Sequence, residues 1–189
     1  MRKKAIIISA LLLSFFLLTA CKSDKKPTSG KEKRESTVIK KQELTAEELQ
    51  RALSEQPLAV DATNCLVQST KYKAIFPDML QAVIVNHTDC EIKRAVVAFA
   101  AWDEDGLPVK IKGRFAFDAP TYIKEVRYDN IHLVSGGRYG EYDGFGISKS
   151  LCIKSVKAIA VSYETLDGEK WENPYYADFK NRYEGKNRE

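Results

Sequence analysis

The sequence predicts a mainly β protein: an antiparallel immunoglobulin-like β-sandwich of about seven strands, with a short helix at each end of the domain. Two observations carry this prediction. From residue 62 onward, apolar residues recur at alternate positions in short runs that turn residues separate. In addition, Asp105-Gly106 and Asp167-Gly168 each follow a long apolar run, and Asp-Gly pairs supply the positive φ angles of tight hairpin turns.

Seven segments have the composition and alternation of strands. They are 63–69, 79–86, 92–102, 108–117, 122–128, 154–164 and a short one at 169–171. The segments 92–102 and 154–164 are apolar on both faces, which is typical of central strands that are covered on both sides. We therefore expect these two segments to lie in the middle of the domain.

Helices are predicted on either side of the strands. Thr45 and Glu48 have the spacing of a capping box, and a helix that ends before Pro57 should follow them. Its apolar residues, Leu49 and Leu53, share one face. After Asn173-Pro174, a second short helix should run to just before Gly185. Three of its aromatic residues fall on one face: Tyr176, Phe179 and Tyr183.

The first residues have the pattern of an export signal. Three basic residues at 2–4 precede an uncharged apolar run at 5–18, and small residues then lead to Cys21. The alternative, an uncut membrane helix, is disfavoured because spanning a bilayer takes about 20 apolar residues. We predict a signal peptide at 1–20, a flexible basic linker at 21–44 and the folded domain at 45–189.

Leu18-Thr19-Ala20-Cys21 resembles the lipobox of bacterial lipoproteins. The resemblance implies cleavage before Cys21 and a diacylglyceryl group on its thiol, often with a further acyl chain on the new amino terminus. The acyl chains would then insert into the lipid bilayer and anchor the protein on the extracytoplasmic face of the cell membrane. Each buried methylene contributes about 0.8 kcal/mol, so two or three acyl chains anchor firmly. The basic residues of the linker either form a plain stalk or approach anionic headgroups.

A second resemblance rests on five segments of the predicted domain. They are Pro77-Asp78-Met79-Leu80-Gln81-Ala82, Ala95-Val96-Val97-Ala98-Phe99, Trp102-Asp103, Gly106-Leu107-Pro108-Val109-Lys110-Ile111 and Trp171-Glu172-Asn173-Pro174-Tyr175-Tyr176. Over residues 60–186, the set looks like an exported lipoprotein family of Gram-positive bacteria whose function is unknown. This resemblance implies a small extracytoplasmic β-sandwich module and no particular activity.

Three cysteines fall within the predicted domain, which an exported protein would place in an oxidising compartment. Cys65 and Cys152 have apolar neighbours, whereas Cys90 follows a polar turn. We predict a Cys65–Cys152 disulfide with Cys90 free. The pairings Cys65–Cys90 and Cys90–Cys152, and the absence of any bridge, stay open as alternatives.

One glycine-rich segment, 136–146, stands out as a candidate binding loop. It carries residue types that are enriched at interaction hot spots, namely Arg138, Tyr139, Tyr142 and Phe145. The alternative is a connection that packs its aromatic side chains against the domain.

Metal and catalytic chemistry have weaker support in the sequence. His87 and Cys90 have ligand spacing, but no second pair lies near them. Asp103 and Asp105 would form a calcium site only if the two Asp-Gly turns converge. No motif of a nucleophilic or metal-dependent hydrolase occurs. We expect no metal, no cofactor and no catalytic residues. A net charge of +4 makes no case for nucleic-acid binding.

The expected function is that of a membrane-anchored extracytoplasmic interaction module, whose partner is an envelope protein or the cell wall. A carrier or sensor for a small ligand, metal or glycan is the second candidate, and an envelope hydrolase is the third. An exposed aromatic patch would favour the interaction module. A closed pocket with convergent polar groups would favour the carrier, and two carboxylates facing across a cleft would favour the hydrolase.

Overall fold

The computed structural model of the protein describes residues 44–72, 75–115, 117, 119–148 and 152–188. The chain divides into two compact units, 1–40 and 41–189, and the described residues belong to the second. The predicted signal peptide, Cys21 and residues 21–43 of the predicted linker lie outside them.

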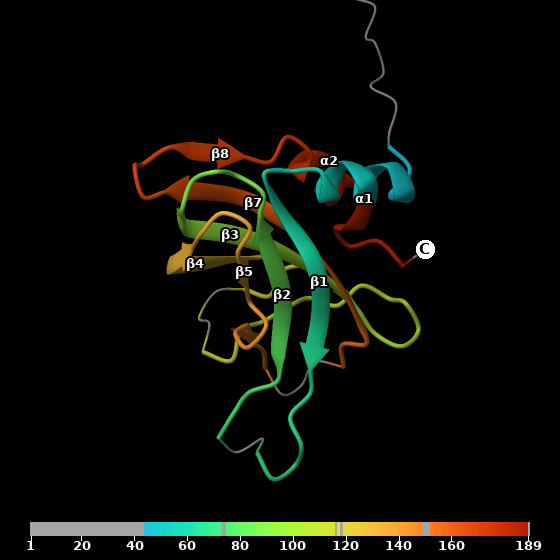
Figure 1. Ribbon diagram of the computed structural model, residues 1–189. Helices are drawn as coiled ribbons and strands as arrows, with labels where there is room; N and C mark the ends of the chain where they lie inside the picture. Colours follow the sequence, from blue (N-terminus) through green and yellow to red (C-terminus); the bar gives the residue numbers. More distant parts are fainter. Residues whose placement is uncertain (1–43, 73–74, 116, 118, 149–151, 189) are drawn as a thin grey trace, which may run out of the picture. The chain divides into compact units, whose positions relative to one another are not determined.

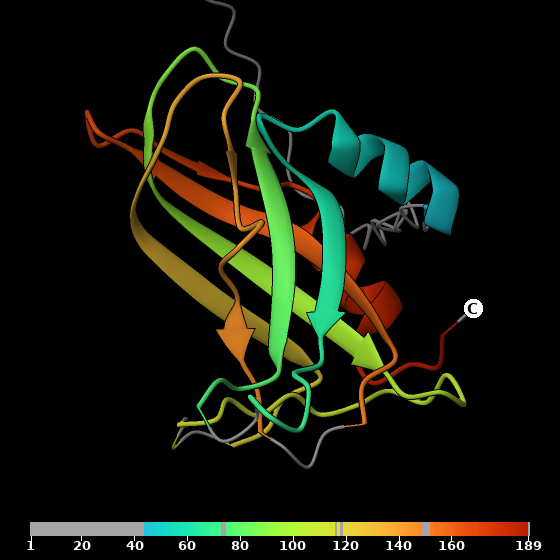
Figure 2. The ribbon, with the colours of Figure 1, turned by 60° about the horizontal axis from the view of Figure 1, so that its bottom comes forward.

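Two antiparallel sheets form the domain (Figures 1 and 2). The first sheet contains β1 (Leu58–Leu66), β2 (Met79–Asn86), β5 (Arg138–Tyr139) and β6 (Phe145–Gly146), with both short strands paired to β2. The second has the order β4 (Ile123–Leu133), β3 (Ile92–Trp102), β7 (Ser155–Thr165) and β8 (Lys170–Glu172). The predicted mainly β fold with two short helices is confirmed. Its immunoglobulin-like type stays a prediction.

The two predicted helices form where the sequence places them. α1 (Ala46–Ser54) begins with a complete capping box: the Glu48 N–H donates to Thr45 Oγ1 (3.2 Å), and the Thr45 N–H donates to the Glu48 carboxylate (2.8 Å). α2 (Tyr176–Tyr183) buries Phe179. Both helices pack on the outer face of the sheet that contains β3, so the domain has three layers (Figure 1).

The domain has two hydrophobic cores, and β3 contributes to both. Val97 and Phe99 point between the sheets, where Leu80 and Ile84 of β2 meet them. Ala98, Ala100 and Trp102 point to the other side, where Leu49, Leu53 and Phe179 of the helices cover them. The prediction that β3 is central and buried on both faces is therefore confirmed.

β-Bulges reverse the expected side of some residues. Strict alternation along 154–164 would place Tyr163 on the same face as Ile159. A register shift opposite Val96 and Val97 inserts one residue into β7, so Tyr163 packs against the core between the sheets while Ile159 packs under the helices. An extra residue exchanges the two faces because side chains alternate along a strand.

Some predicted strand limits are wrong. β1 begins at Leu58 rather than residue 63, since Leu58 and Ala59 are buried directly after Pro57. The described part of 108–117 forms only isolated bridges. Conversely, β4 continues to Leu133, and the glycine-rich segment holds the short strands β5 and β6. Alternation alone did not separate a true strand from an extended loop.

The predicted Cys65–Cys152 disulfide is not formed, since Cys65, Cys90 and Cys152 are all free thiols. Cys65 is half-buried and packs against the core between the sheets, whereas Cys152 is exposed. Because a disulfide needs two side chains directed at each other, these different environments account for the absence of the bridge. Burial, and then the Asp78 carboxylate, raise the pKa of the Cys65 thiol.

Candidate functional site

Three loop segments meet at one end of the sheets, at the bottom of Figure 2. They comprise the described residues of 67–78, 107–122 and 140–148, and we call this region the loop end. Backbone hydrogen bonds join the three: the Ile147 N–H donates to the Asp78 carbonyl (2.8 Å), and the Arg114 N–H donates to the Gly146 carbonyl (2.9 Å). The loop end is therefore one connected surface.

The loop end exposes large hydrophobic side chains. Phe115 is 81% exposed and Phe117 is fully exposed. Tyr72, Ile75 and Phe76 of the first segment are exposed as well. Exposed large apolar side chains on neighbouring loops make this end a candidate contact surface.

A shallow hollow of about 430 Å³ lies within the loop end. Its lining residues are Pro77, Met79, Gly113, Arg114, Phe115, Gly144, Phe145 and Gly146. The glycines keep the loops close together: a Cβ on Gly144 would lie 2.6 Å from the Leu80 carbonyl oxygen, and one on Gly146 would lie 2.9 Å from Pro77. The hollow can accept an apolar group.

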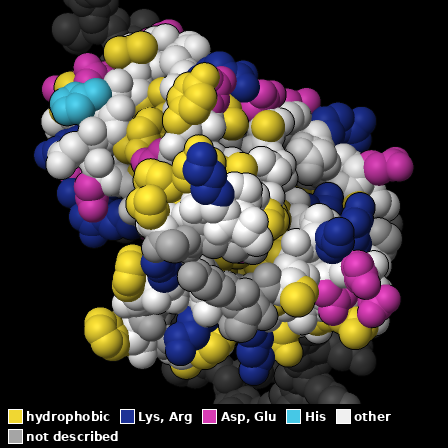
Figure 3. Space-filling view, turned by 90° about the horizontal axis from the view of Figure 1, so that it is seen from below, with side chains coloured by type: hydrophobic (Ala, Val, Ile, Leu, Met, Phe, Trp, Pro, Cys, Tyr) yellow, Lys and Arg dark blue, Asp and Glu magenta, His cyan; other side chains and the backbone are white. Residues whose placement is uncertain are grey.

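Basic side chains accompany the aromatic ones. The Arg114 guanidinium lies 5.2 Å from the centroid of the Phe115 ring, and Lys71 Nζ lies 5.5 Å from that of Tyr72. Lys110 Nζ stands similarly over Tyr122, at 5.2 Å. Figure 3 views this end of the molecule and shows hydrophobic side chains among lysines and arginines. Such pairs combine cation–π attraction with positive charge at the surface.

The four residues of the predicted binding loop do not act as one cluster. Tyr142 is almost fully exposed. Tyr139 packs edge to face on Tyr128, with ring centroids 5.6 Å apart, and Phe145 packs against the core and lines the hollow. Arg138 forms ion pairs with Asp61 (2.8 Å) and Glu141 (3.2 Å). Two of the three aromatics, Tyr139 and Phe145, thus pack within the domain, while Tyr142 does not.

Close approach to β2 explains the glycines of this segment. A Cβ on Gly140, which has a φ of +101°, would lie 2.1 Å from the Ala82 carbonyl oxygen. The glycine-rich segment thus runs along β2 and pairs with it at two places, through β5 and through β6. Within it, Tyr139 donates a hydrogen bond to Asp143. Burial, and then this bond, raise the pKa of Tyr139 to about 12.

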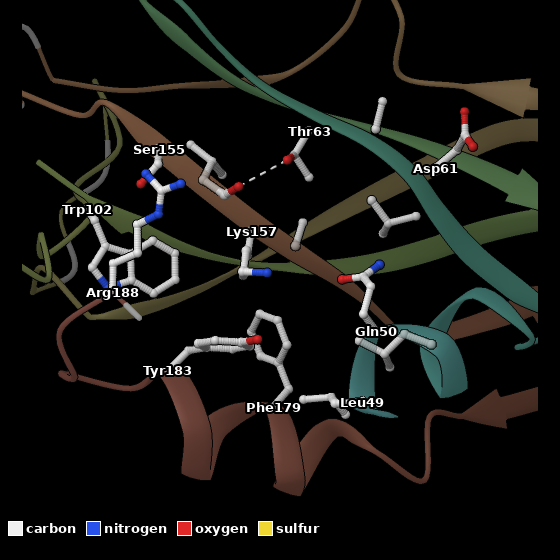
Figure 4. A pocket seen from close by; sticks show the side chains of 15 residues that line it. Leu49, Gln50, Asp61, Thr63, Trp102, Ser155, Lys157, Phe179, Tyr183 and Arg188 are labelled. Atoms are coloured by element: carbon white, nitrogen blue, oxygen red, sulfur yellow. Dashed lines mark hydrogen bonds between the residues drawn. The ribbon is translucent and has the colours of Figure 1, made fainter. Parts of the chain in front are cut away.

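A second hollow of about 270 Å³ lies at the seam between the two sheets, and we call it the seam cavity. Among the described residues, β1 pairs with β2, and β7 pairs with β8 over 162–164. The first half of β7 pairs with β3 along one edge and turns its other edge toward β1. A side-chain hydrogen bond crosses this seam, from Thr63 Oγ1 to the Val156 carbonyl (3.0 Å). α1 and α2 border the opening (Figure 4).

The other candidate site residues from the sequence make hydrogen bonds that stabilise turns and connections. Asp103 accepts hydrogen bonds from the N–H groups of Asp105 (3.1 Å) and Leu107 (2.9 Å). His87 Nδ1 lies 3.0 Å from the Gln56 carbonyl oxygen. Asn86 is buried and donates to the Cys90 and Leu133 carbonyls. Among the described residues, no three or more His, Cys, Asp or Glu side chains are grouped closely enough to hold a metal ion.

No helix in the described part of the chain is long and apolar enough to cross a membrane. This finding bears on residues 44–188 with their gaps and not on the predicted anchor.

Comparisons with known proteins add a family and a fold. Residues 79–186 match a family of unknown function, DUF5780. The crystal structure of a hypothetical protein from Peptoclostridium difficile 630 is similar in fold, with a TM-score of 0.58 and 12% sequence identity. The similarity covers 70% of this chain and 94% of that one. No curated protein sequence matches this chain.

Proposed function

Because its family match covers more than half of its length, this chain belongs to the DUF5780 family, and we propose that it is a lipid-anchored extracytoplasmic module that binds the cell wall through its loop end. The observation that carries this proposal is the exposure of five large apolar side chains on the loop end, namely Tyr72, Ile75, Phe76, Phe115 and Phe117. The lipobox-like Leu18–Cys21 segment supports the anchor.

The chemistry of the loop end favours an anionic polysaccharide of the wall as the partner. Aromatic faces stack on sugar rings, and the hollow accepts an apolar edge. Lys110 and Arg114, already held over aromatic rings, supply positive charge for phosphate or carboxylate groups. Lys71 and Lys112, both exposed on the same segments, add to this charge.

The position of part of the loop end is compatible with this role. The described chain enters at Leu44, whose carbonyl oxygen accepts a hydrogen bond from Arg182 of α2. The described residues of 67–78 follow the end of β1 that lies away from α1 (Figure 1). The entry of the chain therefore does not cover this part of the loop end.

Co-sedimentation with isolated Gram-positive cell walls tests the proposal. The full-length chain should bind walls that keep their anionic polymers and bind at least tenfold less to walls stripped of them. Binding should fall with rising salt, because exposed charges are screened. The double substitution Phe115→Ser with Phe117→Ser should reduce binding at least tenfold. Leu166→Ser, in the turn between β7 and β8, is the matched control for an exposed apolar residue.

Equal binding by the double variant and the wild-type chain would refute the loop end as the contact surface. Equal binding to stripped and intact walls would refute the anionic partner. The lipid anchor has its own test: the intact mass of the membrane-extracted protein should equal the chain from Cys21 plus its acyl groups.

A further inference from the structure

The seam cavity has the features of a second binding site, separate from the loop end. Its residues come from both helices, from β1, from the end of β3, from the first half of β7 and from the segment after α2. At about 270 Å³ it lies just below the usual range of pockets for drug-sized ligands, roughly 300–1,000 Å³. It therefore fits a compact molecule.

The charge around the cavity is positive. Lys157 and Arg188 both line it. Asp61 is the only carboxylate among its described lining residues, and the Arg138 guanidinium holds that carboxylate at 2.8 Å. Figure 4 shows the Lys157 ammonium and the Gln50 amide extending into the same space from opposite sides. The described lining residues thus carry more positive than negative charge, which favours an anionic ligand.

A hydroxyl group in the wall supports a polar ligand. Ser155 Oγ is buried and has no hydrogen-bond partner among the described residues. Buried polar atoms in native proteins are nearly always paired, so an unpaired one needs a reason. Rotation about χ1 of Ser155 would turn this hydroxyl toward the cavity, where it would donate a hydrogen bond to a ligand oxygen.

The remaining wall is apolar and aromatic. Leu49 and Phe179 are buried beside it, and the Tyr183 ring lies 4.9 Å from the Phe179 ring, centroid to centroid. The Lys157 ammonium lies 5.4 Å from the centroid of the Tyr183 ring. The cationic groups and this apolar wall thus adjoin, so a ligand with an anionic head and an apolar body would satisfy both.

We propose that the seam cavity binds a compact organic carboxylate with an apolar or aromatic body. Lys157 and Arg188 attract the carboxylate, and the Ser155 hydroxyl donates a hydrogen bond to it. The apolar body lies against Phe179, Tyr183 and the leucines of α1. This inference does not depend on the loop end or on cell-wall binding.

Tryptophan fluorescence of the full-length chain provides the test. The chain has two tryptophans, and Trp102 lines the cavity while Trp171 does not. In a Trp171→Phe background, the emission reports Trp102 alone. Phenylacetate should change this emission with saturation. Phenylacetamide, which lacks the charge, and acetate, which lacks the ring, should each bind at least tenfold more weakly.

Variants locate the site. In the same background, Lys157→Met should weaken phenylacetate binding at least tenfold, Lys157→Arg should retain most of it, and Ser155→Ala should weaken it about threefold to tenfold. Lys170→Met on β8, outside the cavity, should have no effect. An unchanged melting temperature excludes unfolding as the cause. The proposal is overturned if phenylacetate gives no saturable change, if phenylacetamide binds equally well, or if Lys157→Met leaves the affinity unchanged.

Discussion

The helical end and the loop end use the same kind of side chain in opposite ways. At the helical end, Trp102 and Phe179 are buried, and Tyr183 packs edge to face on both rings, with centroids 5.7 and 4.9 Å away. At the loop end, Phe115 and Phe117 are exposed. Burial of an aromatic ring stabilises a fold, whereas an exposed ring contributes little to it. The difference indicates that the helical end maintains the fold while the loop end is available for contact.

The largest effect on stability should come from the helical end. Phe179→Ala removes a buried ring that holds α2 on β3, and such truncations cost about 3–5 kcal/mol. The loss should appear as a lower urea concentration at the midpoint of unfolding. The control is Tyr142→Ala, which removes an exposed ring. A cost below about 1 kcal/mol for Phe179→Ala would mean that α2 is not part of the cooperative fold.

A backbone contact at the edge of the first sheet should give the next largest effect. Gly140→Ala places a methyl group against the Ala82 carbonyl oxygen, at a positive φ angle, and should cost about 2–4 kcal/mol. Gly136 also has a positive φ, but a Cβ there would meet no atom within 4 Å. Gly136→Ala should therefore cost only the backbone strain, about 1–2 kcal/mol. Equal costs in thermal unfolding would contradict the close approach of this loop to β2.

A smaller effect, dependent on pH, should come from Tyr139. Its pKa is raised to about 12 in the folded state, so the folded chain retains the phenol proton more strongly than the unfolded chain does. The contribution of Tyr139 to the free energy of unfolding is fully present below pH 10 and is lost as the pH rises toward 12. Urea midpoints measured from pH 9 to 12 should fall less for Tyr139→Phe than for the wild-type chain. Parallel curves would show that Tyr139 does not contribute.

The smallest effect on stability should come from the loop end. Phe117→Ser removes a fully exposed ring and should change the free energy of unfolding by no more than about 0.5 kcal/mol. The same substitution is part of the variant that should lose cell-wall binding. A large destabilisation would mean that Phe117 is packed in solution, and the contrast between the two ends would fail.

The sequence predicted what depends on local chemistry. Thr45 and Glu48 located α1, and the double-faced apolar run at 92–102 located the central strand. It did not predict the bulge that moves Tyr163 to the other face, because a bulge depends on the neighbouring strand. Nor could it separate Phe115 and Phe117 from strand residues, since their alternation is that of a half-buried strand. The seam cavity unites residues from 49 to 188, a combination that only tertiary structure reveals.

The contact between Leu44 and α2 bears on the order in which the domain assembles. Arg182 Nη1 donates a hydrogen bond to the Leu44 carbonyl (2.9 Å), and Trp102 Nε1 donates to the Lys186 carbonyl (2.8 Å). Leu44 and Arg182, nearly 140 positions apart in the chain, thus belong to the same layer that covers β3. Such distant contacts slow folding, because the entropy of closing a long loop must be lost before the contact forms. The outer face of β3 is therefore covered only once α2, near the end of the domain, has formed.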